Sequence, residues 1–196
     1  FTCYGQEEKY QPNKKSYVNE DHLSFFRFAG IIIARALIEG FCINANFTTS
    51  FWKQILNHEP NINDLKEIDL ELYNSIQSLL NNDVDSLYFS FTLNEDQFGS
   101  YLSIPLKENG NTIDVTNENK NEYIQLLSDY YLKGSIKDQV NSFCEGFYSL
   151  LLPLDIRLFT PKELNMLIGG TASIDVNDFK NNTEYELPYT AGNTCC

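Results

Sequence analysis

Positive charge is scarce in this chain. Its 14 lysine and arginine residues stand against 27 aspartate and glutamate residues, which gives a formal net charge of −13. Non-specific binding to nucleic acid requires basic stripes that neutralise phosphates, so the composition argues against a nucleic-acid partner. Strong negative charge favours solubility and steering towards a basic partner.

Metal-ligating residues are also few. The chain has two histidines and five cysteines, and no two cysteines form a Cys-x-x-Cys pair. Zinc sites use such pairs at short spacings, so we expect no metal and no cofactor. Cys42 and Cys144 are interpreted as buried free thiols. Cys195 and Cys196 end the sequence without a neighbouring base to activate them.

Long apolar runs are missing as well. The longest, residues 29–37, is broken by Gly30 and Arg35 and is shorter than the roughly 20 residues of a membrane helix. The first ten residues lack the basic start and apolar middle of a signal peptide. We therefore expect a cytoplasmic protein that does not bind membranes.

No catalytic motif can be recognised. The sequence contains no GxSxG elbow, no P-loop and no GxGxxG loop. A hydrolase based on two carboxylates is one hypothesis, with Glu95 and Asp96, or Asp175 and Asp178, as acid and base. At this density of acidic residues, these pairs are better interpreted as solvated surface or helix-start residues.

The residues that are present predict a globular fold of the α+β class, mainly helical. Hydrophobic residues make up 42% and aromatic residues 14%, enough for one large domain or two small ones. Apolar spacing and capping residues predict helices over residues 23–40, 47–56, 64–81, 119–132, 136–150, 160–169 and 175–181. Strands are predicted over 88–93, 101–104 and 113–115, with a hairpin turn at Asn109-Gly110.

Several segments resemble one family. NEDHLSFFRFAGIIIARALIEG, residues 19–40, resembles the helix near the middle of the N-terminal lobe of HECT-type ubiquitin ligases. The resemblance continues through residues 69–83, 106–127 and 143–170 and ends with IDVNDFKNNTEY, residues 174–185. It covers nearly the whole chain in the family's order, and the motifs are most similar to those of the members that carry WW domains.

The resemblance implies an architecture. Residues 1–196 would form a partial HECT domain, an N-terminal lobe truncated at both ends, with a large helical subdomain and a small inserted α/β subdomain at about residues 69–131. The family's catalytic cysteine lies in a C-terminal lobe, in a Thr-Cys-Phe context that this sequence does not contain.

The resemblance also implies a function. HECT ligases take ubiquitin from a ubiquitin-conjugating enzyme onto their own cysteine by transthiolation and pass it to a substrate lysine. The N-terminal lobe docks the conjugating enzyme, which makes the transfer effectively intramolecular. The expected partners are a conjugating enzyme, ubiquitin, and protein substrates bound by regions outside this chain. The chain alone is expected to be inactive.

Motif matching places the conjugating enzyme in a hydrophobic groove of the small subdomain. Leu72, Ile76 and Leu79 would line one side of the groove, and Tyr123 and Leu127 the other. Each set is also spaced one to two turns apart on one helix face. The alternative is that this face packs in the core. Leu127 replaces an aromatic residue that some members have.

Two further hypotheses concern binding. Tyr4 and Phe98 match positions where the WW-domain members bind a second, non-covalent ubiquitin, although Phe98 could instead be a packing residue at a strand end. The rival to a ligase is a non-catalytic interaction module that retains the lobe's fold.

Overall fold

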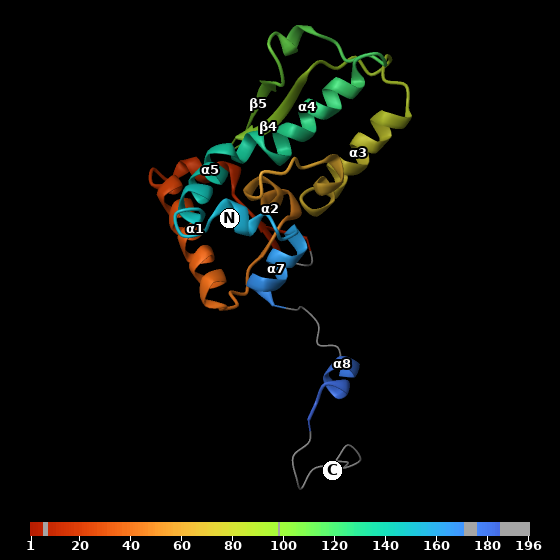
Figure 1. The fold of residues 1–196 in the computed structure, drawn as a ribbon. Coiled ribbons are helices and arrows are strands. Elements are labelled where there is room, and N and C mark those ends of the chain that lie inside the picture. Colours follow the sequence, from red (N-terminus) through yellow and green to blue (C-terminus); the bar gives the residue numbers. More distant parts are fainter. Residues whose placement is uncertain (6–7, 98, 171–175, 185–196) are drawn as a thin grey trace.

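The structure is a computed structural model that describes residues 1–5, 8–97, 99–170 and 176–184. Figure 1 shows a helical body around α1 (His22–Glu39) and α5 (Lys137–Phe147), and beside it a smaller body of helices and a hairpin. The predicted α+β, mainly helical fold is confirmed.

The helical body is built on the crossing of α1 and α5. A Cβ on Gly30 would overlap the Phe143 carbonyl oxygen, and a Cβ on Gly146 would overlap the Arg27 carbonyl oxygen. Each helix therefore has a glycine where it meets the backbone of the other. Helix α1 ends as predicted at Gly40, whose φ of 70° lies in the left-handed region that suits a helix C-terminus.

Around this crossing lies the first hydrophobic cluster. Helix α2 (Thr49–Ile55) contributes Phe51 and Trp52, which are fully buried, and α7 (Pro161–Gly169) contributes Leu164 and Ile168. The predicted start of α7 is confirmed, because Thr160 and Glu163 form a reciprocal capping box. The short helix α6 (Pro153–Ile156) joins α5 to α7.

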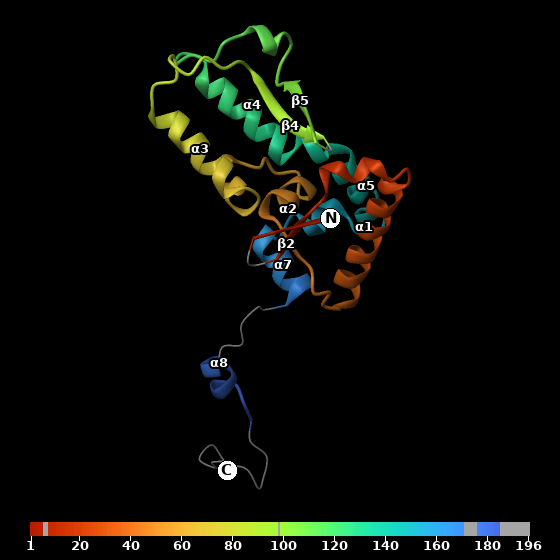
Figure 2. The same cartoon turned by 180° about the vertical axis from the view of Figure 1, so that it is seen from behind.

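A three-stranded sheet in this body was not predicted. Strands β1 (Thr2–Tyr4), β2 (Lys9–Gln11) and β3 (Asn46–Phe47) pair in that order, and β2 runs parallel to β3. The Thr48 backbone N, just before α2, donates to the Tyr10 carbonyl of β2 at 3.1 Å, and Figure 2 shows β2 near α2. The strands are only two or three residues long, and β3 joins β2 from more than 30 residues away, so no local periodicity marks them in the sequence.

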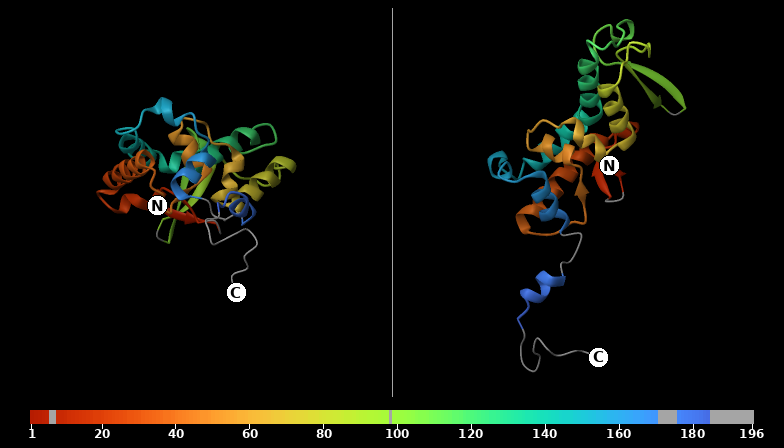
Figure 3. Two further views of the ribbon diagram at one scale, coloured as in Figure 1. Left: turned by 60° about the horizontal axis from the view of Figure 1, so that its bottom comes forward. Right: turned by 90° about the vertical axis from the view of Figure 1, so that its right-hand side faces the viewer.

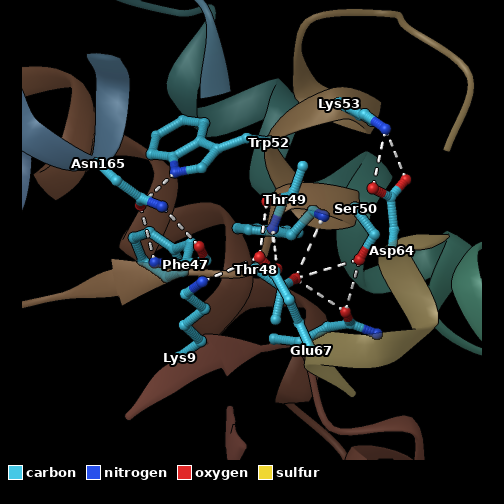
Figure 4. Close-up of polar contacts among 12 residues, drawn as sticks. Lys9, Phe47, Thr48, Thr49, Ser50, Trp52, Lys53, Asp64, Glu67 and Asn165 are labelled. Atoms are coloured by element: carbon cyan, nitrogen blue, oxygen red, sulfur yellow. Dashed lines mark hydrogen bonds and ion pairs between the residues drawn. The ribbon is translucent and has the colours of Figure 1, made fainter. Parts of the chain in front are cut away.

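Polar side chains connect this sheet to the helices (Figure 4). The Asn165 Oδ1 accepts hydrogen bonds from the Trp52 Nε1 at 2.6 Å and from the Phe47 backbone N at 2.9 Å. Its Nδ2 donates to the Phe47 carbonyl at 2.7 Å. Glu67 accepts from Lys9 at 2.9 Å and from the Thr49 backbone N at 2.6 Å, which joins β2 to the start of α2.

The smaller body contains α3 (Leu70–Asn81), α4 (Lys120–Leu132) and the antiparallel hairpin of β4 (Thr92–Gln97) and β5 (Ser100–Pro105). Figure 3 shows it extending away from the helical body. Its core is a second hydrophobic cluster that includes Leu65, Ile76, Phe91 and Leu132. The boundaries 69–131 for a docking subdomain remain a prediction.

Four local predictions in this body were wrong. Residues 64–81 are not one α-helix, because the 3₁₀ helix η2 (Ile62–Glu67) precedes α3 and the Asp69 side chain caps α3. The 88–93 strand begins later, at Thr92, and 113–115 forms no strand beyond the bridge Ser90–Asp114. The observed hairpin of β4 and β5 turns between Gln97 and Ser100. The predicted hairpin turn at Asn109-Gly110 is absent, because Gly110 begins the 3₁₀ helix η3 (Gly110–Thr112).

Contacts between the two bodies come from charged and polar groups. Lys14 in the turn η1 (Lys14–Val18) forms an ion pair with Glu95 of β4, and Lys15 forms a longer one with Asp96 at 3.8 Å. Gln54 of α2 donates to the Leu132 carbonyl at 2.9 Å. Two more short elements complete the described chain, η4 (Gly134–Ile136) and α8 (Val176–Asn181).

Candidate partner-docking site

The five residues predicted to line an open groove lie on α3 and α4 as expected, but most of them are not open to solvent. Ile76 is 0% exposed, Tyr123 is 8% exposed and Leu127 is 6% exposed. Leu72 and Leu79 are half-buried at the edge of the same cluster. The prediction that Ile76, Tyr123 and Leu127 face solvent is therefore wrong.

The reason is that α4 packs against the segment that follows α3. The Tyr123 ring meets the Phe89 ring edge-on, with centroids 5.2 Å apart, and the Phe91 ring at 5.6 Å. Burial raises the pKa of the Tyr123 hydroxyl above its ordinary value. These side chains belong to the core of the smaller body and support its surface from beneath.

Apolar groups are exposed at the far end of this body instead. Tyr88 is 88% exposed and Leu87 is 55% exposed, although the buried Val84 lies only three residues before Leu87. The backbone of Tyr88 has a φ of 48°, in the left-handed region that bulky residues rarely adopt. Backbone strain of this kind is concentrated at functional sites.

These groups lie where α3 ends and α4 begins. The Lys120 Nζ, on the first turn of α4, donates to the Asn82 carbonyl at 2.8 Å, just after α3. Both helix ends point away from the helical body (Figure 1). We call this region the distal surface, which consists of the exposed Leu87 and Tyr88 and the half-buried Leu79, Leu80 and Phe89.

Sequence reasoning missed Leu87 and Tyr88. It placed Tyr88 in a strand, where the alternation of YFSFTL would turn every second side chain inward. The available signal was the mostly polar segment that precedes them, residues 81–86 (NNDVDS). Such a composition is typical of a loop and argues against a strand that begins two residues later.

The acidic character of the chain is also evident here. Asp83, Asp85, Glu118 and Glu122 are exposed on the segment after α3 and around the start of α4. The nearby Lys107 pairs with Glu122 at 2.8 Å, and its Nζ lies 3.8 Å from the centroid of the Phe91 ring. The distal surface is therefore apolar with an acidic rim.

The predicted second site for ubiquitin is only partly described. Tyr4 is half-buried and lines a pocket of about 200 Å³ between the two bodies, together with Lys14, Asp69 and Tyr131. Burial is the main cause that raises its pKa. Phe98 lies outside the described residues, so the pairing of Tyr4 with Phe98 remains a prediction.

The cysteines differ from expectation at one position. Cys144 is half-buried, and burial raises the pKa of its thiol to about 11, so it remains protonated at neutral pH. Cys42 was expected to be buried but is exposed, because it lies in the loop after α1. Cys195 and Cys196 lie outside the described residues.

None of the helices in the described ranges has the length and apolar character of a membrane span. In the same part of the chain, no three histidine, cysteine, aspartate or glutamate side chains are grouped in a way that would hold a metal ion.

Comparison with known proteins identifies the family. The model of the HECT domain, described as a ubiquitin-transferase domain, matches residues 1–196. The chain belongs to the HECT-domain family. The resemblance inferred from the motifs in residues 19–40, 69–83 and 143–170 is thereby confirmed.

Among curated HECT proteins, E3 ubiquitin-protein ligase HACE1 of Danio rerio is 41% identical over 191 residues, which cover 96% of this chain and 21% of that protein. HACE1 of Homo sapiens has the same identity and coverage. E3 ubiquitin-protein ligase ptr1 of Schizosaccharomyces pombe is 38% identical over 92% of this chain and 6% of that protein. The chain thus spans about a fifth of the length of the HACE1 relatives.

Proposed function

We propose that this chain is the part of a cytoplasmic HECT-type ubiquitin ligase that docks a ubiquitin-conjugating enzyme. The membership of the family supports a role in ubiquitin transfer. In the proposed reaction, the docked enzyme's thioester is attacked by a cysteine thiolate of a separate catalytic lobe, and ubiquitin then passes to a substrate lysine. Docking raises the local concentration of the donor thioester.

The observation that supports the docking site best is the exposure of Tyr88 and Leu87 at the distal surface. Aromatic side chains held on an ordered backbone are frequent hot spots in protein interfaces, because they bury a large area at little entropic cost. In this proposal, Tyr88, Leu87 and the exposed part of Leu79 contact the conjugating enzyme at the distal surface. Leu72, on the first turn of α3, extends the contact along the helix. Ile76, Tyr123 and Leu127 support them from beneath.

The charge around the surface favours a particular kind of partner. An apolar centre rimmed by Asp83, Asp85 and Glu118 complements a partner surface with exposed apolar residues flanked by lysine or arginine. The contact area is small, so the affinity is expected to be weak, in the micromolar range.

The docking proposal is tested by Tyr88→Asn, since asparagine tolerates a positive φ and the change removes only the aromatic group. We expect binding of a conjugating enzyme, chosen from a panel by pull-down, to weaken by at least about 1 kcal/mol, or roughly fivefold. Binding is measured by nuclear magnetic resonance titration.

The matched control for this variant is Tyr101→Asn on β5, which removes another exposed tyrosine of the same body. This variant should bind like the wild type, and both variants should change the stability by less than about 0.5 kcal/mol. Equal affinities for Tyr88→Asn and the wild type would remove Tyr88 from the docking surface.

We further propose that the 196 residues alone do not carry ubiquitin as a thioester. The sequence lacks the Thr-Cys-Phe context of the family's catalytic cysteine, and the raised pKa of Cys144 disfavours that thiol, since the thiolate is the nucleophile in transthiolation. With ubiquitin, activating enzyme and a binding conjugating enzyme, we expect no reducible ubiquitin adduct of this chain on a non-reducing gel. An adduct that dithiothreitol removes would contradict the proposal, and peptide mapping would then locate the cysteine.

The rival function is a non-catalytic interaction module with the same fold. A pull-down with a panel of conjugating enzymes that carry ubiquitin as a thioester separates the two functions. Retention of at least one of them by the wild-type chain supports a ligase part, whereas retention of none favours the module.

A further inference from the structure

One asparagine joins the segment after α3 to the segment before α4. The Asn117 Nδ2 donates to Asp83 Oδ1 at 2.7 Å, and the Asn117 Oδ1 accepts from the Val84 backbone N at 3.2 Å. The Asn117 backbone N donates to Asp85 Oδ1 at 2.8 Å. A single residue thus makes three hydrogen bonds to three consecutive residues that lie more than 30 positions earlier in the sequence.

The two aspartates complete this arrangement. The Asp83 Oδ1 also accepts from the Asp85 backbone N at 3.0 Å, which closes an Asx turn. The hydrogen bond from Asn117 is the main cause that holds the pKa of the Asp83 carboxyl below its ordinary value. The carboxylate therefore stays ionised and continues to accept at neutral pH. We call Asn117, Asp83 and Asp85 the loop clip.

The clip holds one end of the segment that carries the distal surface. Val84 is fully buried, and the Leu87 backbone N donates to its carbonyl at 3.0 Å. At the other end, the Val115 backbone N donates to the Phe89 carbonyl at 2.8 Å. Tyr88 lies between these two fixed points, so its strained backbone is held by its neighbours rather than by contacts of its own side chain.

We propose that Asn117 is a positioning residue for the docking of the conjugating enzyme: through the loop clip it orders residues 82–88 before binding and so fixes the direction in which Tyr88 and Leu87 are presented. This inference rests on the proposed docking function. Ordering the segment in advance removes an entropic cost from association. Without the clip, the partner has to order the segment itself, and the affinity falls although no contact residue has changed.

An exchange of side chains tests this role. Asn117→Asp removes the donor to Asp83 and brings a third carboxylate beside Asp83 and Asp85. Asp83→Asn combined with Asn117→Asp restores a donor and an acceptor at the same two positions, in reversed direction, with the wild-type net charge. The control is Asn119→Ala, because the Asn119 side chain accepts from the Thr116 backbone N and donates to the Asp114 carbonyl, both of the segment just before α4.

Two measurements are made on each variant: titration with the conjugating enzyme chosen in the pull-down, and hydrogen exchange of the Val84, Asp85 and Leu87 amides. For Asn117→Asp we expect these amides to exchange faster and binding to weaken at least about fivefold, as for Tyr88→Asn. We expect the double exchange to recover both properties, and Asn119→Ala to bind like the wild type. Unchanged exchange of α5 amides shows that the helical body remains folded.

The outcomes separate this inference from the docking proposal. If Tyr88→Asn weakens binding but Asn117→Asp does not, docking at the distal surface stands and the positioning role of Asn117 is overturned. The role is also overturned if the double exchange restores slow amide exchange without restoring binding. If neither Tyr88→Asn nor Asn117→Asp weakens binding, both proposals fail, even where the amides of Asn117→Asp exchange faster.

Discussion

The two bodies of the molecule are held together in different ways. In the helical body, α1 and α5 approach until backbone meets backbone, at Gly30 and Gly146. In the smaller body, α3 and α4 are separated by side chains such as Ile76 and Tyr123, and hydrogen bonds from Asn117 fix the connecting segment. Where backbone meets backbone, no side chain larger than glycine fits. Where side chains pack beneath a hydrogen-bonded loop, the exposed residues of that loop can differ without disturbing the core. The proposed docking surface lies on this smaller body.

The largest effect should come from breaking the helix crossing. Gly146→Ala would bring a methyl group into the Arg27 carbonyl, and because backbone atoms are involved the helices must separate. We expect a loss of about 4 kcal/mol in the free energy of unfolding, measured by urea denaturation, or failure to fold.

The matched control for the crossing is Gly134→Ala, whose added methyl would lie 3.7 Å from its nearest neighbours. That distance is an ordinary van der Waals contact, so we expect a change of less than about 1 kcal/mol. Equal stabilities for Gly146→Ala and Gly134→Ala would show that the helix crossing can relax. The helical body would then not depend on close backbone contact, contrary to the comparison made above.

A smaller loss of stability is expected from a substitution in the core of the smaller body. Ile76→Ala would leave a cavity among fully buried neighbours such as Val84 and Phe91, at a cost of about 3 kcal/mol. Leu70→Ala on the same helix removes an exposed side chain and should change the stability by less than about 0.5 kcal/mol.

Hydrogen exchange sharpens the comparison for these two variants. For Ile76→Ala, we expect amides of α3 and α4 to exchange faster while those of α1 and α5 change less. Equal acceleration in both bodies would show that they unfold as one cooperative unit.

The sequence predicted the helices better than the strands, for a local reason. The helix of residues 23–40 and the start of α7 carry their own signals, a left-handed Gly40 and the Thr160–Glu163 capping box. Strands β1 and β2 are only three residues long, and β3 pairs with β2 only because a distant segment meets it. The Asn109-Gly110 hairpin failed for the same kind of reason: Asn109 does adopt a positive φ, but Gly110 packs beneath the Phe91 carbonyl and the chain turns there without pairing.

The sequence by itself determined the family, the mainly helical fold, and the positions of helices such as α1, α4 and α7, because these depend on local pattern and on motif order. It placed the apolar stripes of α3 and α4 correctly but could not say which of their sides would be covered. Only the tertiary structure decided that Ile76, Tyr123 and Leu127 lie inside and that Tyr88 lies outside. Burial depends on which distant segment packs over a face, and here that segment is the one that Asn117 holds in place.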